Sequence, residues 1–267
     1  MSLRARCARP LSAVLIFLFG WLILCADVKA DGPRWIKGKN SSVCKVYEHY
    51  LSTIPSPEGA PGATWQDKLM CARTIPPGIS QLEQPKWRDI DPRENMKMAA
   101  SVFNNTTYHL LEQPPPSWMV PMLSDPTHNQ ATIDDVNANF EAGRDEWQVT
   151  EADVDNDGKI DRLVKFKRGS CSAEWPDSER YFVAIMVLDS DGTVVKTRKT
   201  RQILRSNTLG VVGGPSSYDL FSYRSNTYVD QWNNKKNDQG ERILSVYLNK
   251  HNETSLVCRL AFPTNNN

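Results

Sequence analysis

The chain has 267 residues, of which 24% are charged, and its formal net charge at pH 7 is +1. A balance this close to neutral argues against nucleic acid or an anionic membrane surface as the partner. No stretch beyond the N-terminal segment is apolar enough to span a membrane, and the length suits one large domain or two small ones.

The first 30 residues have the pattern of a secretory signal peptide. Three arginines precede an apolar run from Leu11 to Leu24, and Val28-Lys29-Ala30 supplies a cleavage site after Ala30. The apolar run has 14 residues, whereas a spanning helix needs about 20. The pattern predicts a secreted or periplasmic protein. A retained anchor is one alternative. A lipoprotein attached through Cys25 is another, but Leu24 is large for the position before a lipidated cysteine.

Cleavage after Ala30 would leave 237 residues with 28 basic and 30 acidic side chains, because the signal takes four basic residues and one acidic residue with it. The resulting net charge of −2 again argues against a nucleic-acid partner. We expect a monomer without a membrane span, whose partner is an unidentified protein or glycan.

Residues 31–143 form a proline-rich region with short helical patterns. Ser42 is the expected N-cap of a helical pattern that continues to Leu51, and Asp91 followed by Pro92 is typical of a helix start. A third pattern runs from Thr132 to Phe140, before Gly143. The sequence therefore predicts a region of short helices and long loops.

The stretch from Asp153 to Asp161 has the spacing of a calcium-binding loop. Acidic residues stand at loop positions 1, 3, 5 and 9, and Gly158 stands at position 6, where the chain must turn sharply. Carboxylates this close together are costly to fold without a cation between them. The predicted ligands are the side chains of Asp153, Asp155, Asp157 and Asp161 and the backbone carbonyl of Lys159. The alternative is a metal-free acidic turn held by side-chain to backbone hydrogen bonds.

The flanks of this loop indicate strands. Residues 147–150 and 163–167 alternate between apolar and polar side chains, and position 12 of the loop is Val164, where an EF-hand has a bidentate glutamate. Without that glutamate we expect a modest affinity, on the order of 10⁻⁴ M. The stretch resembles the aspartate-rich calcium loops of FG-GAP and integrin-α-like β-repeats, DxDxDGxxD between two strands. The resemblance implies bound calcium, but the loop occurs once, so it does not extend to a propeller.

Residues 144–267 are rich in β-forming residues with turn signals between them. Expected strands include Tyr181–Leu188, Thr193–Thr200 after an Asp-Gly turn, and the hairpin strands of the last 50 residues. We predict an α+β protein in which the N-terminal helices pack on an antiparallel, meander-type sheet or sandwich. A boundary near residue 143 could separate two domains, with a single domain preferred.

Four cysteines follow the predicted signal peptide, and an even number in an exported chain predicts two disulfides. Three connectivities are possible. We favour Cys44–Cys71 and Cys171–Cys258, because each pair lies within one compositional half. The alternative is four buried free thiols.

The sequence shows no nucleophile–base signature, phosphate loop or zinc spacing, and its four histidines are widely separated. Asp219, Asp230 and Glu241 could supply a carboxylate pair of the glycosidase type, although surface carboxylates are commoner. The basic residues between Lys196 and Arg205 are interpreted as one solvated strand face. The sequence therefore predicts an exported, non-enzymatic calcium-binding structural or recognition protein. The alternatives are a secreted polysaccharide hydrolase with a structural calcium ion, and a periplasmic inhibitor or immunity protein.

Overall fold

The structure is a computed structural model that describes residues 33–54, 75, 81–107, 130–168, 182–204, 216–233, 237–250 and 253–263. The chain divides into two units, Met1–Asp31 and Gly32–Asn267. The first unit contains the predicted signal peptide with Cys25 and lies outside the described residues. Every element of the fold belongs to the second unit. Among the described residues, no helix is both long and apolar enough to cross a membrane.

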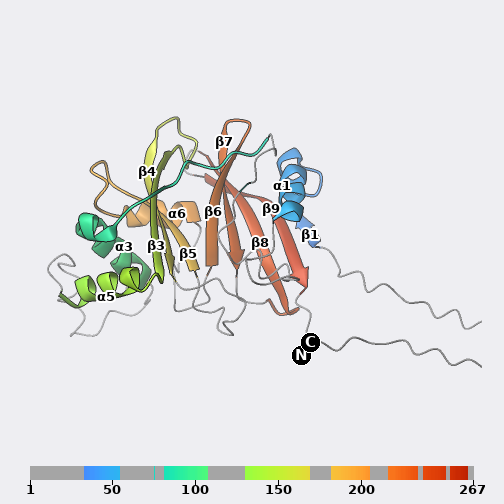
Figure 1. Ribbon diagram of the computed structural model, residues 1–267. Helices are drawn as coiled ribbons and strands as arrows, with labels where there is room; N and C mark the ends of the chain where they lie inside the picture. Colours follow the sequence, from blue (N-terminus) through green and yellow to red (C-terminus); the bar gives the residue numbers. More distant parts are fainter. Residues whose placement is uncertain are drawn as a thin grey trace, which may run out of the picture. The chain divides into compact units, whose positions relative to one another are not determined.

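Nine strands form one open, mostly antiparallel sheet in the order β1-β9-β8-β7-β6-β5-β4-β3-β2 (Figure 1). The strands are β1 Arg34–Lys37, β2 Arg88–Asp89, β3 Asp145–Ala152, β4 Asp161–Arg168, β5 Phe182–Val187, β6 Ser216–Tyr223, β7 Asn226–Asn233, β8 Glu241–Lys250 and β9 Glu253–Pro263. Among the described strands, only β5 and β6 pair in parallel, at Val183 and Ser217. The expected sheet-rich architecture is confirmed, as one sheet in the described part of the chain and not as a sandwich.

The helices are α1 Ser42–Thr53, α3 Met96–Thr107, α5 Gln130–Glu141 and α6 Thr197–Leu204. A 3-10 turn, η1 Pro92–Asn95, leads into α3, and the Asp91 carboxylate caps it by accepting a 2.8 Å hydrogen bond from the Arg93 amide. The three helices expected in the N-terminal region are therefore present. The N-cap of α1 is Ser41, one residue before the position that the sequence suggests.

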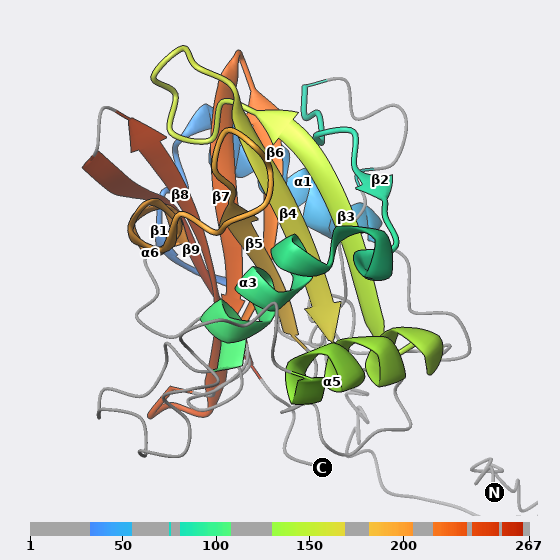
Figure 2. The ribbon, with the colours of Figure 1, turned by 90° about the vertical axis from the view of Figure 1, so that its left-hand side faces the viewer.

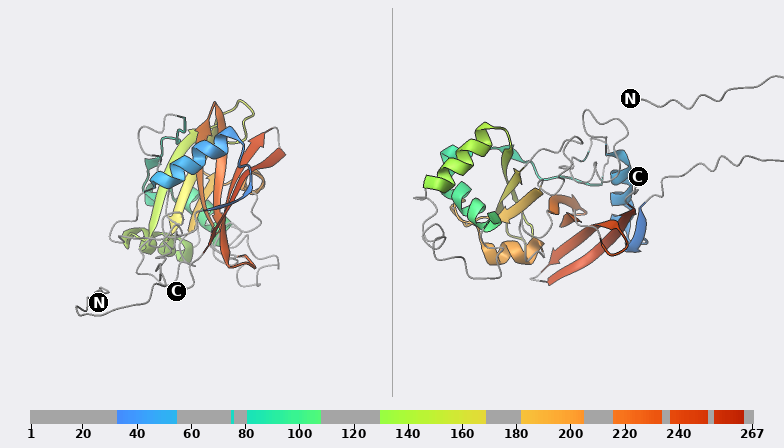
Figure 3. Two further views of the ribbon diagram at one scale, coloured as in Figure 1. Left: turned by 90° about the vertical axis from the view of Figure 1, so that its right-hand side faces the viewer. Right: turned by 90° about the horizontal axis from the view of Figure 1, so that it is seen from below.

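The helices cover different parts of the sheet. Buried residues of α3 and α5 pack with those of β3, β4 and β5, and Figure 2 shows these two helices in front of the strands. Buried residues of α1 pack with β6 to β9, and Figure 3 shows α1 at the end of the sheet away from α3 and α5. A third cluster joins α6 to β4, β5, β6 and β7.

The helix α6 replaces the strand expected from Thr193 to Thr200. After β5, Asp189 to Gly192 form a turn, Leu188 and Val195 make a single bridge, and the helix then begins at Thr197. The chain must cross over between β5 and β6 because these strands are parallel, and a helix is the usual connection. The buried residues Thr200, Ile203 and Leu204 have helical spacing. The interpretation of the basic run as a strand face is therefore wrong.

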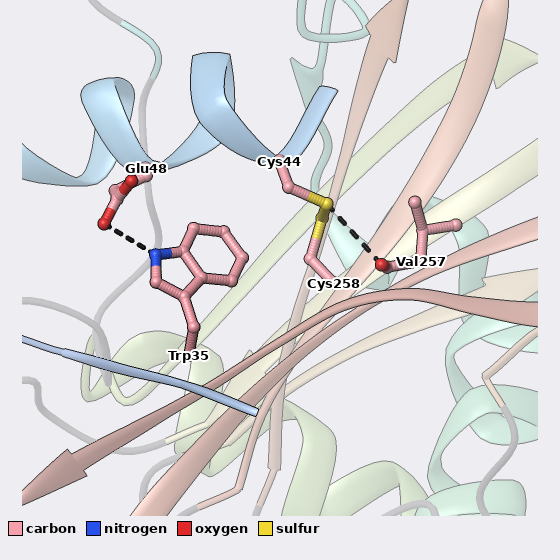
Figure 4. The surroundings of a disulfide bond; sticks show 5 residues. All are labelled: Trp35, Cys44, Glu48, Val257 and Cys258. Atoms are coloured by element: carbon pink, nitrogen blue, oxygen red, sulfur yellow. Dashed lines mark hydrogen bonds between the residues drawn. A yellow bond between two sulfur atoms is a disulfide. The ribbon is translucent and has the colours of Figure 1, made fainter. Parts of the chain in front are cut away.

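Both disulfide pairings favoured from the sequence are wrong, because Cys44 of α1 is bonded to Cys258 of β9 (Figure 4). The assumption that each bridge stays within one half of the chain fails for a topological reason. Strand β1 pairs with β9, the last strand, and so brings α1 onto the C-terminal part of the sheet. Cys71 and Cys171 lie outside the described residues.

The surroundings of the disulfide are tightly packed. The Trp35 indole nitrogen donates a 2.9 Å hydrogen bond to Glu48, which joins β1 to α1 (Figure 4). The Cys44 sulfur lies 3.5 Å from the Val257 carbonyl oxygen, a contact that is not a true hydrogen bond because a disulfide sulfur carries no hydrogen. Gly38, between β1 and α1, has a φ of +89°. A Cβ atom there would lie 2.3 Å from the Val257 carbonyl oxygen and 2.8 Å from the Cys44 sulfur.

Gly38→Ala is expected to destabilise the protein by about 2 kcal/mol or more, because the substitution adds both backbone strain and a clash with backbone atoms. Urea denaturation of the variant would measure the loss. Gly143→Ala is the matched control, since Gly143 also has a positive φ but a Cβ atom there would meet nothing within 4 Å. Equal losses for the two variants would show that the clash at Gly38 contributes nothing.

Candidate metal centre

The candidate metal centre is the loop between β3 and β4. The two strands pair antiparallel from Asp145 opposite Arg168 to Ala152 opposite Asp161, so residues 153–160 form the connection. Trp147 and Phe166 face each other across the pair and are buried, with ring centroids 4.4 Å apart. The expected strand–loop–strand arrangement is confirmed, and the paired strands fix both ends of the loop.

Hydrogen bonds within the loop fold it around its first aspartate. The two carboxylate oxygens of Asp153 accept from the amides of Asp157, at 3.0 Å, and Gly158, at 2.9 Å. The Asp157 carboxylate accepts from the Lys159 amide at 2.8 Å. Gly158 has a φ of +87°, which a glycine adopts without strain. These bonds close the turn around the Asp153 carboxylate.

Asn156 fastens the loop to the rest of the sheet. Its side-chain amide donates to the carbonyl oxygens of Thr227, at 3.0 Å, and Asn249, at 2.7 Å. Its side-chain oxygen accepts from the Thr227 amide at 2.7 Å. The Asn249 side chain in turn donates to the Ile203 carbonyl of α6 at 3.3 Å. The loop is thereby connected to β7, β8 and α6, and this anchor was not identified from the sequence, because its partners lie far along the chain.

Three of the five predicted ligands come together. Oxygen atoms of Asp153, Asp155 and Asp157 all lie within 4.8 Å of one another. The Oδ1 atom of Asp155 is buried and has no hydrogen-bond partner among the described residues. A buried carboxylate oxygen without a partner is costly, and a cation would satisfy it. The donor set of hard oxygens therefore fits a divalent cation. Lys159 lies in the same turn, and its carbonyl stays a predicted ligand.

Asp161 is placed differently from the other three aspartates. It is the first residue of β4 and 8% exposed, and its two carboxylate oxygens lie 2.7 and 2.9 Å from the Lys199 ammonium of α6. The same ammonium lies 2.9 Å from Oδ2 of Asp155. Lys199 thus bridges two predicted metal ligands. The sequence offered no signal for this contact beyond a basic residue in a basic run.

The charges in this cluster influence one another. Burial raises the pKa of Asp161, and the hydrogen bond from Lys199 offsets this only in part. Burial alone would lower the pKa of Lys199, but its hydrogen bonds to Asp155 and Asp161 outweigh burial and raise it. Lys199 therefore remains an ammonium and supplies one positive charge to the acidic loop.

No protein-family model, curated protein or solved structure matches this chain. The likeness to FG-GAP loops therefore rests on residues 153–161 alone. At the level of geometry, Asp153, Asp155 and Asp157 form a cluster that could hold a metal ion.

A second pair of charged residues, one on β4 and one on β6, is buried beside Trp87. The Lys165 ammonium lies 3.0 Å from the Asp219 carboxylate, and each side chain is 4% exposed. The Trp87 ring covers the ammonium at 4.3 Å from the ring centroid. The Gln84 side chain also donates to Asp219, at 3.4 Å. This ion pair ties β4 to β6 at the parallel junction, and sequence reasoning missed Lys165 because it occurs in an alternating strand pattern.

Two of the three carboxylates considered for a catalytic pair do face each other. Asp219 of β6 and Asp230 of β7 are direct cross-strand partners, which places their Cβ atoms about 5 Å apart. Both are almost fully buried, and Asp230 accepts a hydrogen bond from the Tyr47 hydroxyl. Glu241 is elsewhere, ion-paired with Arg34. Both side chains are therefore shielded from solvent in this conformation.

A cleft of about 1060 Å³ lies between residues 86–95, the ends of β3 and β4, and the turn after β5. Its walls are mostly polar, and Asp219 and Asp230 are not among the described residues that line it. One of its acidic residues, Asp91, has its pKa lowered by a hydrogen bond from Arg93, which favours the ionised form and not a general acid. Of the four histidines, His49 is exposed on α1, and His109, His128 and His251 lie outside the described residues.

Proposed function

We propose that this is an exported, non-enzymatic calcium-binding protein with a structural or recognition role. The observation that carries the proposal is the convergence of three carboxylates within 4.8 Å of one another, one of which, that of Asp155, has a buried oxygen without a hydrogen-bond partner in the described part of the chain. Calcium accepts several carboxylate and carbonyl oxygens in flexible geometry, whereas magnesium demands a near-ideal octahedron and gives up its waters reluctantly. The loop therefore suits calcium better.

The way in which the loop is held supports a structural role. Asn156 ties the loop to β7 and β8, so an ion bound beside it would brace the ends of several strands. The Cys44–Cys258 disulfide agrees with an oxidising compartment, as the predicted signal peptide requires. The partner remains a protein or a glycan of unspecified identity.

Calcium is expected to raise the melting temperature of the purified protein. At an affinity on the order of 10⁻⁴ M, 10 mM Ca²⁺ stabilises the folded state by about 2.7 kcal/mol, which corresponds to roughly 5–10 °C for a chain of this size. Magnesium should have a smaller effect. The double variant Asp155→Ala/Asp157→Ala should lose the calcium effect, because it removes two of the three clustered carboxylates.

Asp191→Ala/Asp238→Ala is the matched control for that variant. It also removes two carboxylates, from exposed positions in two other turns, and should keep the full calcium shift. Calorimetry that finds no heat of Ca²⁺ binding, together with no thermal shift at millimolar Ca²⁺, would exclude the proposed function.

The hydrolase alternative makes a different prediction for the same protein. A hydrolase must turn over a polysaccharide and needs an accessible carboxylate pair to do so. The proposed function requires no turnover and no such pair. The buried state of Asp219 and Asp230 does not favour that alternative.

A further inference from the structure

Lys199 contacts a carboxylate that is also a predicted metal ligand. Its ammonium lies 2.9 Å from Oδ2 of Asp155 and 2.7 Å from Oδ1 of Asp161. The other oxygen of the Asp155 carboxylate is buried and has no hydrogen-bond partner among the described residues. The carboxylate that contacts the lysine is therefore also one of the three that form the candidate metal centre.

We propose that Lys199 is a built-in counter-cation of the aspartate loop that competes with the bound metal ion for Asp155. This inference rests on the proposed function, because it concerns the same site. Lys199 stabilises the loop when the metal is absent, and it lowers the affinity of the loop for a divalent cation.

The burial of this contact makes it more than a surface ion pair. The side chains of Asp155 and Asp161 are only 14% and 9% exposed, and that of Lys199 is 27% exposed. Exposed ion pairs contribute little, but partly buried charges are screened less by water and salt. Removing the lysine would leave Asp161 as a buried carboxylate without its cation, a costly arrangement unless a metal ion replaces it.

The charge of the Lys199 ammonium and the flexibility of its side chain explain the competition. A divalent cation at the three aspartates and an ammonium on one of the same carboxylates repel each other strongly at a few ångströms. The lysine has a flexible four-carbon stem and can turn toward solvent, while buried Thr200, Ile203 and Leu204 hold α6 in place. Metal binding thus displaces the Lys199 side chain and makes Asp161 available as a fourth acidic ligand.

The first test compares Lys199→Met with wild-type protein by calorimetric titration with Ca²⁺ and by thermal unfolding. Lys199→Met should bind Ca²⁺ at least about tenfold more tightly, because the competing charge is gone. Without metal it should melt about 3 °C or more below wild type. Arg198→Met is the matched control, because it removes one positive charge from an exposed neighbour on the same helix; it should change neither quantity.

The outcomes of this titration separate the two proposals. Equal Ca²⁺ affinities for wild type and Lys199→Met would overturn the competition and leave the proposed function standing. Absence of Ca²⁺ binding in both proteins would overturn the proposed function and the competition together.

A second test needs no variant and therefore does not depend on folding of Lys199→Met. Wild-type protein is acetylated briefly with and without 10 mM Ca²⁺, and peptide mass spectrometry reports the labelling of Lys199 relative to the exposed Lys196. Calcium should increase the relative labelling of Lys199 several-fold, because the displaced amine is more exposed and no longer held by two carboxylates. Unchanged labelling under conditions in which calorimetry detects Ca²⁺ binding would overturn the inference.

Discussion

Removing the Cys44–Cys258 disulfide is expected to lower the free energy of unfolding by about 5 kcal/mol. The two cysteines are 214 residues apart in the chain. In the chain-entropy model, closing a loop of that length restricts the unfolded state by about this amount. The double variant Cys44→Ala/Cys258→Ala, compared with wild type by urea denaturation, measures the loss. Both positions are fully buried, so the variant also loses some packing.

The same comparison made in a Cys71→Ala/Cys171→Ala background isolates the effect of the Cys44–Cys258 bridge from that of any second bridge. With Cys44 and Cys258 joined, these two are the only cysteines after residue 30 that can form a second bridge. Peptide mapping of the oxidised protein should recover the Cys44–Cys258 link. A loss below about 1 kcal/mol in the Cys44→Ala/Cys258→Ala variant would show that the bridge does not restrict the unfolded chain as the model requires.

Lys165→Met is expected to destabilise the protein by about 3–5 kcal/mol, because it leaves the Asp219 carboxylate buried without its cation. Of its partners among the described residues, Asp219 would keep the weaker ones, the Leu220 amide at 2.9 Å and the Gln84 side chain at 3.4 Å. The Trp87 ring would also lose the ammonium that it covers. Urea denaturation at pH 7 measures the effect.

The double variant Lys165→Met/Asp219→Leu should recover much of that loss, since apolar side chains of similar volume can replace a buried ion pair. Lys167→Met is the control on the same strand. Its partner Glu146 is 64% exposed, so this variant should lose less than about 1 kcal/mol. If Lys165→Met and Lys167→Met lost equal stability, burial of the Lys165–Asp219 pair would have no energetic consequence.

Features that depend on neighbouring residues could be predicted from the sequence. The β3–loop–β4 unit follows from alternation on both sides of the aspartates and from the turn that Gly158 permits. The start of η1 follows from Asp91 and Pro92, whose capping contact spans two residues. In each case the signal and the structure lie within the same short segment.

Features that depend on distant partners could not be predicted. Lys199 meets Asp161 across 38 residues, and nothing in the local sequence distinguishes it from the other basic residues of the run. Helix α6 was missed because the parallel pairing of β5 and β6, which requires a crossover, has no local signature. The disulfide was misassigned because its geometry depends on β1 lying beside β9.

The pairing of β1 with β9 also has a consequence for the order of folding. Trp35 lies opposite Leu260, so the first strand completes its hydrogen bonds only after the last strand has been synthesised. Contacts of such high sequence separation slow folding, because the intervening chain must be ordered before they form. A chain that emerges from its N-terminus onward therefore completes this edge of the sheet only after β9 has been synthesised.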